Sequence, residues 1–470
     1  MNRFVQACPR VASRVPLPGP GPVLKALSVL GLVALSFVAG AAAMHFDLPP
    51  SGHLEKSFRG ARAWLDRRDL PRARGAPSGD SAGTAVTLDR PGKTCDGFTL
   101  VTTTLDTRAV LLDMRGNVVH QWQLPFRRAW PRPDHVPDPA PDDQVHWFRC
   151  HLYPDGGLLA VYQADWHTPY GYGLARLDRD SNLLWAYPAN VHHDVDVGED
   201  GRIYTLTQRV ASDPPAGLDS FPAPYVADYL VVLSPDGAEL EKVALVEALR
   251  DSPYALALAP LRRAKRREPA PPGGPPPGRQ AFLQNGDALH ANSVRVLGGS
   301  LAAKFPLFAP GQVLVSLRNL DALAVVDLPT RRVAWAARGL WRGQHDAAFL
   351  DDGRLLLFDN LGGPAGARVL EYDPVTQAVP WSYGGEPAAP FAAPLRGAAQ
   401  RLPNGNTLLV DPDGGRLLEV TREKEPVWEC YGPWSPGLPG WDYAPASVTG
   451  ARRYRAEDLT FLRGGARARP

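Results

Sequence analysis

The sequence predicts an all-β fold, a six-bladed β-propeller preceded by an N-terminal transmembrane or signal-anchor helix. Three observations support this prediction. Two strand-and-turn patterns alternate along the chain, 45 glycines and 49 prolines are spread over 470 residues, and one apolar segment lies near the N-terminus. Glycine and proline distributed in this way predict many turns and therefore many short strands.

The apolar segment covers residues 23–44, VLKALSVLGLVALSFVAGAAAM. At 1.5 Å per residue a helix of this length spans a hydrocarbon core of about 30 Å. Arginines and no acids precede it, so residues 1–22 are expected to stay cytoplasmic and the rest to be exported to the extracytoplasmic (periplasmic) side. The alternative is a signal peptide cleaved after Ala43, because AGAAAMHF offers an Ala-x-Ala site. Both interpretations export the bulk of the chain.

The remainder divides into a stalk and one large domain. Residues 45–92 are rich in proline and arginine and predict a stalk, and residues 93–460 predict the propeller. Residues 246–283 contain a basic, proline-rich insertion, which predicts a surface loop. The formal net charge of +2 gives no reason to expect a nucleic-acid partner.

The propeller prediction depends on two series of six segments. In the first series a turn precedes an apolar strand, in segments that begin at Cys95, Tyr153, Gly198, Ala309, Leu350 and Leu402. In the second series a polar turn joins two strands, in segments that begin at Ala109, Leu174, Leu230, Leu323, Arg368 and Arg416. With the run before each glycine turn, this predicts about four strands in each of six units. Residues 447–455 are expected to supply the strand that the first unit lacks. A pair of β-sandwiches is the alternative, which the regular alternation disfavours.

Three consecutive units carry histidine just before the glycine turn. The segments are VHHDVD with His192 and His193, LHANSV with His290, and GQHDAA with His345. These runs are expected on the innermost strands, which surround the central channel of a propeller, so the histidines should converge there. Arg318, in VSLRN, ends the strand that follows His290.

The histidines allow two kinds of chemistry. With Asp194 and Asp346 they could bind zinc or another divalent ion. Without a metal, imidazole acts as a nucleophile or as a general acid or base. Arg318 favours the second kind, because a guanidinium repels a metal ion and attracts a sulfate or phosphate group. Four aromatic residues could flank an aromatic substrate, namely Trp147, Phe148, Trp166 and Tyr170.

The segments HHDV, HANSV, VSLRN, GQHDAAFLDDGRLLLFDN and AQRLPNGNTLLV together resemble the arylsulfate sulfotransferase family. Its members are exported bacterial six-bladed propellers that do not use the nucleotide sulfate donor. The resemblance covers about residues 95–455. It implies transfer of a sulfuryl group from an aryl sulfate ester to a phenolic acceptor, with no cofactor and no metal.

The resemblance also implies roles for the site residues. His345 would be transiently sulfated, and His290 and Arg318 would hold the sulfuryl oxygens. His192 or His193 would act as acid or base, with His193 preferred because its spacing to the glycine turn matches that of His345. The anchor-like N-terminus and the insertions depart from a plain exported propeller. Two alternatives therefore stay open: a metal-dependent propeller hydrolase or lyase, and a catalytically silent, membrane-anchored propeller that binds a ligand or partner.

Overall fold

The computed structural model describes residues 31, 35–36, 85–165, 167, 169–219, 221, 223–262, 286–385, 393–412, 414–432 and 447–463. The chain divides into two compact units, residues 1–72 and 73–470, and every described strand belongs to the second. Residues 1–22, the stalk up to residue 84 and nearly all of the apolar segment 23–44 lie outside the described residues. Among the residues that are described, no helix has the length and apolar character needed to cross a membrane.

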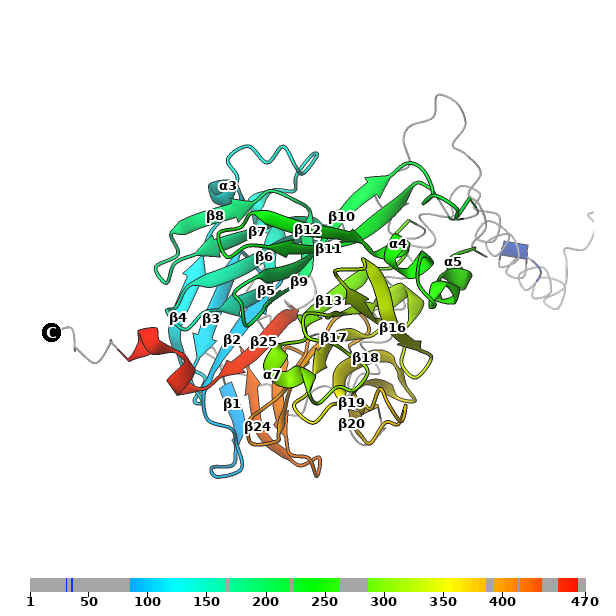
Figure 1. Ribbon diagram of the computed structural model, residues 1–470. Helices are drawn as coiled ribbons and strands as arrows, with labels where there is room; N and C mark the ends of the chain where they lie inside the picture. Colours follow the sequence, from blue (N-terminus) through cyan, green and yellow to red (C-terminus); the bar gives the residue numbers. More distant parts are fainter. Residues whose placement is uncertain are drawn as a thin grey trace, which may run out of the picture. The chain divides into compact units, whose positions relative to one another are not determined.

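The second unit is a six-bladed β-propeller (Figure 1), so the predicted fold is confirmed and the sandwich alternative is wrong. Blade 1 consists of β25 (Val448–Tyr454), β2 (Phe98–Thr103), β3 (Arg108–Leu112) and β4 (Val118–Gln123). Blade 2 consists of β5 (Val145–Leu152), β6 (Leu158–Ala164), β7 (Gly171–Leu177) and β8 (Leu183–Tyr187). Blade 3 consists of β9 (Val191–Val197), β10 (Ile203–Ala211), β11 (Tyr225–Leu233) and β12 (Glu239–Ala244). Blade 4 consists of β13 (Ala291–Val296), β14 (Val313–Leu317), β15 (Ala322–Asp327) and β16 (Arg332–Arg338). Blade 5 consists of β17 (His345–Phe349), β18 (Leu355–Gly363), β19 (Gly366–Tyr372) and β20 (Trp381–Gly384). Blade 6 consists of β21 (Ala398–Arg401), β22 (Thr407–Asp411), β23 (Arg416–Val420), β24 (Pro426–Tyr431) and β1 (Ala85–Asp89).

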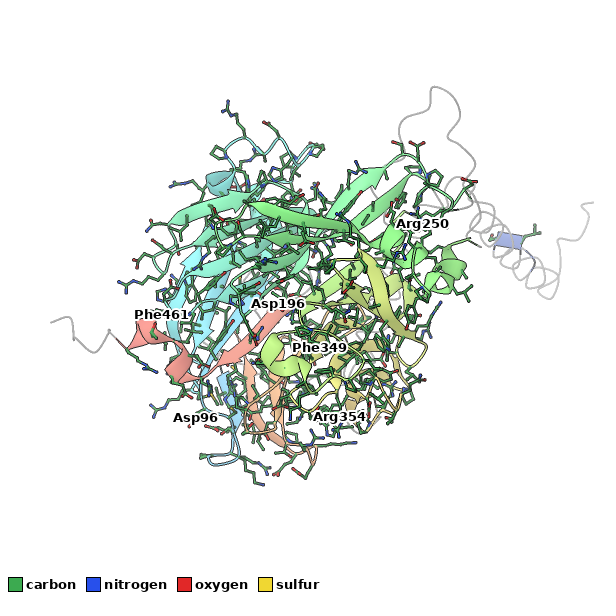
Figure 2. All side chains as sticks on the ribbon, in the orientation of Figure 1. Asp96, Asp196, Arg250, Phe349, Arg354 and Phe461 are labelled. Atoms are coloured by element: carbon green, nitrogen blue, oxygen red, sulfur yellow. The ribbon has the colours of Figure 1, made fainter. Side chains whose placement is uncertain are left out.

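Burial within a blade follows from radial packing. Every residue of β6 is buried, because neighbouring blades cover both faces of a middle strand. The outer strand β4 is mostly exposed and buries only Trp122. The innermost strands β25, β5, β9, β13, β17 and β21 contact one another around the axis. Figure 2 labels Phe349, at the end of β17, near the middle of this unit, and Arg250 and Phe461 at its periphery.

Both ends of the described propeller chain close the ring. β25 is the innermost strand of blade 1 and pairs antiparallel with β2, which confirms the prediction for residues 447–455. β1 pairs with β24 and adds a fifth strand to blade 6. In Figure 1 the red β25 lies beside the blue β2, and the blue β1 lies beside the orange β24. A buried ion pair between Arg453 of β25 and Glu419 of β23, at 2.5 Å, joins blade 1 to blade 6. Removing one partner of such a pair costs about 3–5 kcal/mol.

Short helices connect the blades. They are α3 (Phe126–Ala129), η1 (Asp142–Gln144), α4 (Leu245–Arg250), η2 (Ala255–Leu258), α5 (Ala259–Arg262), α7 (Gly299–Ala302), η3 (Arg318–Leu320), η4 (Ala456–Asp458) and η5 (Thr460–Leu462).

Three of these helices lie at the start of the insertion predicted at residues 246–283. The first part of that insertion forms α4, η2 and α5, and Val246, Leu249 and Leu258 are buried in the core shared by blades 3 and 4. The described part of the insertion is therefore helical, whereas the prediction of a surface loop for the basic, proline-rich part falls on residues outside the described part. The spacing of its apolar residues is helical, but the proline-rich composition of the following segment concealed this pattern. Residues 263–285 lie outside the described part of the chain.

Candidate active site

A cavity of about 170 Å³ lies on the propeller axis, where the innermost strands of blades 2 to 4 begin. Its wall is formed by Phe148, Gln163, Asp165, Tyr170, His193, His290, Arg318, Leu395 and Arg396. Of the predicted site residues, the structure thus brings His193, His290 and Arg318 together. His192 and His345 are buried and do not line the cavity.

Irregular backbone at the start of these strands aims the side chains. β9 has a bulge between the pairs His192↔Leu206 and Val195↔Thr205, and within it His193 adopts a positive φ of 60°. β17 has a bulge directly after His345↔Phe358, where Asp346 has a φ of 51°. Positive φ is uncommon outside glycine, but histidine, asparagine and aspartate tolerate it best. The His-Asp sequence therefore suits a bulge as well as a site.

The two bulges differ by one residue, which affects the comparison of His193 with His345. His192 and His345 each pair with the fourth residue of the following strand. By strand register His192, and not His193, therefore corresponds to His345. His193 is the extra residue of the longer bulge, and it is the one that reaches the cavity wall.

The aspartates of the two His-Asp pairs stabilise the fold. The Asp194 carboxylate accepts hydrogen bonds from Val294 N (3.0 Å) and Arg295 Nη1 (2.5 Å) of β13. The Asp346 carboxylate accepts bonds from Arg295 Nη2 (2.9 Å) and from Ala399 N (2.9 Å) of β21. Each aspartate thus bonds to the innermost strand of the next blade, and Arg295 bridges the two. Within the described chain no group of three or more histidine, cysteine, aspartate or glutamate side chains is arranged to hold a metal ion.

His345 has one ring nitrogen fully engaged and the other free. Its Nδ1 lies 2.7 Å from Asn360 Oδ1 and 3.1 Å from the carbonyl oxygen of Gly343. A carbonyl oxygen can only accept, so Nδ1 carries the proton. The Asn360 amide is oriented by its own bonds to the carbonyl oxygens of Ala393 (2.5 Å) and Arg396 (2.6 Å). The lone pair is therefore on Nε2, which is buried and has no hydrogen-bond partner among the described residues.

The surroundings of His345 keep its ring neutral. Burial lowers the pKa of His345 well below its usual value, and the charges of Arg318, His290 and Arg149 lower it further. The hydrogen bond with Asn360 opposes this shift without reversing it. At neutral pH the Nε2 lone pair is therefore available to an electrophile.

His290 is held by a buried carboxylate. Its Nδ1 lies 2.5 Å from Asp287 Oδ2 and 3.0 Å from the hydroxyl oxygen of Tyr170, which itself donates to Asp287 at 2.9 Å. Burial would raise the pKa of Asp287, but the charge of His290 and the bonds from His290 and Tyr170 lower it overall. Asp287 is thus ionised, and a carboxylate at Nδ1 stabilises the ring when Nε2 takes up a proton.

His193 and His192 lie in hydrogen-bond contact with each other. Their Nδ1 atoms are 2.8 Å apart, and His192 Nε2 lies 3.4 Å from the buried Asp228 carboxylate. Burial, followed by the charges of His290 and His192, lowers the pKa of His193 well below its usual value. The His193 ring stands edge-on to Phe148, with centroids 5.0 Å apart, and lies 4.9 Å from the His290 ring.

Two of the four predicted aromatic residues line the cavity. Phe148 and Tyr170 form part of its wall. Trp147 is completely buried in the core between blades 1 and 2, and Trp166 is not among the described residues.

The decisive comparison is with protein families. The family model described as arylsulfotransferase (ASST) matches residues 150–432, which is more than half of the chain and includes all five predicted site residues. The chain belongs to the arylsulfotransferase family. No curated protein matches it significantly.

This arylsulfotransferase-family chain also matches solved structures at low sequence identity. A protein of unknown function from Bacteroides caccae is 12% identical, with a TM-score of 0.44, over 71% of this chain and 93% of its own. A streptogramin B lyase is 10% identical, with a TM-score of 0.39, over 76% and 85%. The virginiamycin B lyase from Staphylococcus aureus is 9% identical, with a TM-score of 0.39, over 75% and 85%.

Sequence reasoning missed three residues of this candidate site. Asp287 lies three residues before His290, a spacing that could have suggested a partner. Asn360 lies within β18, the strand that pairs with His345, and only the strand register places it beside that ring. Arg396 adds a second guanidinium to the cavity wall, where it binds Asp165 at 2.5 Å. It comes from the loop before β21 and carries no sequence signal.

Proposed function

We propose that this arylsulfotransferase-family chain moves a sulfuryl group from an aryl sulfate ester to a phenolic acceptor through a sulfohistidine at His345, without a nucleotide donor. The observation that supports this most is the neutral His345 ring, with its proton held on Nδ1 by Asn360 and an unpartnered Nε2. Arg318, whose charge acts on His345, adds a cation that can hold sulfuryl oxygens.

In the first half-reaction Nε2 of His345 attacks the sulfur of the aryl sulfate. The N–S bond forms as the bond between sulfur and the aryl oxygen breaks, and the electron pair of that bond leaves with the phenolate. A proton from Nε2 of His290 neutralises the phenolate, while Asp287 keeps Nδ1 of His290 engaged. The family resemblance implies this acid role for His192 or His193. The buried carboxylate at Nδ1 makes His290 the better candidate.

In the second half-reaction the acceptor phenol attacks the sulfur of the sulfohistidine. Its hydroxyl proton passes to Nε2 of His290, the N–S bond breaks, and the electron pair returns to Nε2 of His345. Both catalytic residues then regain their starting protonation. Neutral His193 and the Phe148 ring would contact the aromatic ring of donor or acceptor from the cavity wall.

Access to His345 requires a side-chain movement. His345 is 3% exposed and does not line the cavity, whereas Arg318 does. We propose that an incoming sulfate ester draws the Arg318 guanidinium toward itself and so opens a path to Nε2. Catalytic contacts commonly become shorter only when substrate binds.

We further propose that residues 23–44 anchor the chain in a membrane with the propeller on the extracytoplasmic side, or are cleaved as a signal peptide. The support is the apolar run and the arginines before it. Retention of the full-length chain in alkali-washed membranes supports the anchor, and a shortened soluble chain that begins after Ala43 contradicts it.

Turnover tests the proposal directly. The full chain is incubated with 4-nitrophenyl sulfate and a phenol, with and without a chelator. We expect nitrophenol release that survives chelation and is lost in His345→Ala. Chelator-sensitive release would favour the metal-dependent hydrolase or lyase, and no release with a panel of aryl sulfates would favour the silent binding propeller.

A further inference from the structure

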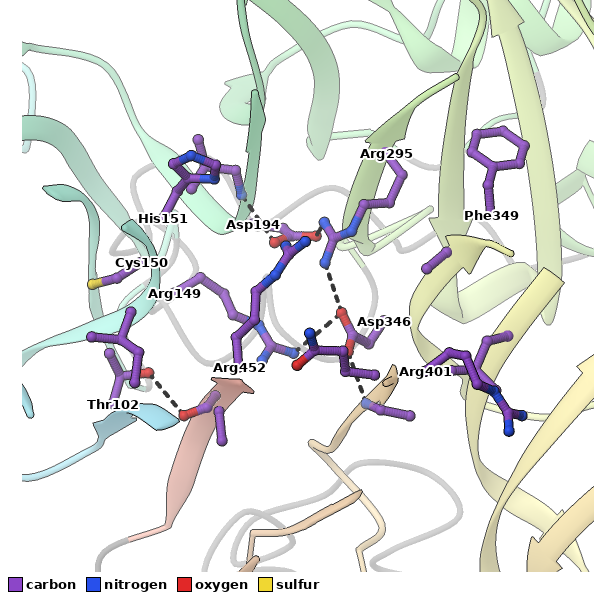
Figure 3. Close-up of a pocket in the computed structure, with 18 of the residues that line it drawn as sticks. Thr102, Arg149, Cys150, His151, Asp194, Arg295, Asp346, Phe349, Arg401 and Arg452 are labelled. Carbon is purple, nitrogen blue, oxygen red and sulfur yellow. Dashed lines mark hydrogen bonds and ion pairs between the residues drawn. The ribbon is translucent and has the colours of Figure 1, made fainter. Parts of the chain in front are cut away.

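A second cavity, here called the arginine chamber, lies on the axis beyond the histidine cavity (Figure 3). Its volume is about 190 Å³, well above the roughly 10–15 Å³ that a single water needs. All six innermost strands line it. On β5, β9, β13 and β21 the chamber residues follow, along the chain, residues that line the histidine cavity. Its defining side chains are Arg149, His151, Asp194, Arg295, Asp346 and Arg452.

Three guanidinium groups converge in this chamber. In Figure 3 Arg149 enters from β5, Arg295 from β13 and Arg452 from β25, and their side chains point toward one another. Arg295 is fully used, because it binds both Asp194 and Asp346. Arg149 reaches the carbonyl oxygen of Gly397 at 3.3 Å and stays 3.7 Å from Asp346.

Arg452 is the cation that the protein leaves uncompensated. It lines the chamber, is exposed to solvent, and makes no hydrogen bond or ion pair with any described residue. The two carboxylates cannot neutralise it, because Asp194 and Asp346 already accept bonds from Arg295 and from backbone N–H groups. Three guanidinium groups therefore face two saturated carboxylates, which leaves an excess of positive charge.

The neighbouring His151 is consistent with an excess of positive charge in the chamber. Burial, then the charges of Arg452, Arg176 and Arg295, lowers the pKa of His151 to about 3. His151 is thus a neutral ring on the chamber wall that can donate or accept one hydrogen bond. Such a wall suits an anion and disfavours a cation.

We propose that the arginine chamber is a binding site for a small tetrahedral oxyanion, such as sulfate or phosphate, held by Arg452 and Arg149. Guanidinium groups bind two oxygens of such anions at once, which gives strong, oriented hydrogen bonds. The Asp194–Arg295–Asp346 bridge is shared by both His-Asp strands, so the anion would sit directly against the residues that follow His193 and His345. The proposal does not depend on sulfuryl transfer by His345.

Isothermal titration calorimetry tests the proposal with inorganic sulfate, phosphate and chloride at matched ionic strength. The full chain carries Arg318→Gln in every sample, so that anion binding in the histidine cavity is weakened. We expect saturable binding of sulfate or phosphate, and adding Arg452→Gln should weaken it about tenfold or more, as expected for the loss of a bidentate charged contact. Arg115→Gln is the matched control, because Arg115 is also exposed but lies in the β3–β4 turn.

A second readout places the anion. Nuclear magnetic resonance titration of His151 should show a higher pKa when the anion is bound, since an adjacent negative charge favours the imidazolium. Equal affinity in the Arg452→Gln and Arg115→Gln proteins would overturn the proposal, as would an unchanged His151 titration. A preference for sulfate over phosphate, or the reverse, identifies which oxyanion the chamber takes, and saturable binding of chloride alone would also overturn it.

Discussion

At the scale of single residues, the histidine and the aspartate of each His-Asp pair have different roles. Asp194 and Asp346 bond to the next blade and to Arg295, so they are structural. His193 lines the cavity, and His345 is buried next to it with its Nδ1 fixed by Asn360, a side chain outside its own strand. The aspartate therefore accounts for folding and the histidine for the proposed chemistry.

Asn360 is expected to position the nucleophile. When Nε2 of His345 attacks, positive charge develops on the ring, so the Nδ1–H bond to Asn360 Oδ1 should strengthen in the transition state. Hydrogen bonds to charged groups contribute about 1.5–3 kcal/mol, so Asn360→Ala should lower kcat/KM for an aryl sulfate about ten- to a hundredfold. The measurement is steady-state turnover together with the rate of nitrophenol release in a single turnover.

Asn360→Asp is the control for this prediction. It keeps an acceptor for Nδ1 but loses the donor to the carbonyl oxygens of Ala393 and Arg396. It should lose thermal stability as Asn360→Ala does and yet retain more of the single-turnover rate. If both variants lose that rate equally, Asn360 only supports the loop and does not position His345.

At the scale of elements, the repeated strand pattern was sufficient to predict the blades. Six turn-and-strand segments correspond to β2, β6, β10, β14, β18 and β22, because a blade strand needs only an apolar run and a tight turn. The closing strand β25 was also predictable, since the first unit lacked an innermost strand. The helices α4 and α5 were not, because proline-rich composition dominated that region.

The details of the site depend on geometry that strand periodicity does not encode. A bulge adds one residue and turns the side chains that follow to the other face. This is why spacing to the glycine turn aligned His193 with His345, whereas strand register aligns His192 with it. Asn360, Asp287 and Arg396 reach the site through strand pairing or loops, so a single sequence gave little indication of them.

At the scale of the whole molecule, the buried histidines make stability depend on pH. Burial is the main cause of four lowered histidine pKa values. The pKa of His146 falls to about 4 and that of His151 to about 3. The pKa values of His193 and His345 fall well below the usual value. In the unfolded chain each of these histidines would have a pKa of about 6.5. Between these values the unfolded state binds more protons than the folded state, so stability is full above about pH 6.5 and falls as the pH falls.

The free energy of unfolding should therefore decrease steeply as the pH falls from about 6.5 to about 5. Each such histidine contributes a slope of up to about 1.4 kcal/mol per pH unit below its unfolded pKa. Urea unfolding at several pH values measures the slope of the free energy of unfolding against pH. His146→Gln should reduce this slope by the contribution of one histidine, up to about 1.4 kcal/mol per pH unit. His120→Gln is the control, because His120 is only partly buried on an outer strand. A slope that does not change in His146→Gln would contradict the assignment.

The most direct test of the central claim is to trap the covalent intermediate. The full chain is mixed with 4-nitrophenyl sulfate and no acceptor, quenched at alkaline pH, and examined by intact and peptide mass spectrometry. The account predicts one added SO₃ group, located on His345, absent in His345→Ala and released when a phenol is added before the quench. Modification of any other residue, or continued turnover in His345→Ala, would contradict the account.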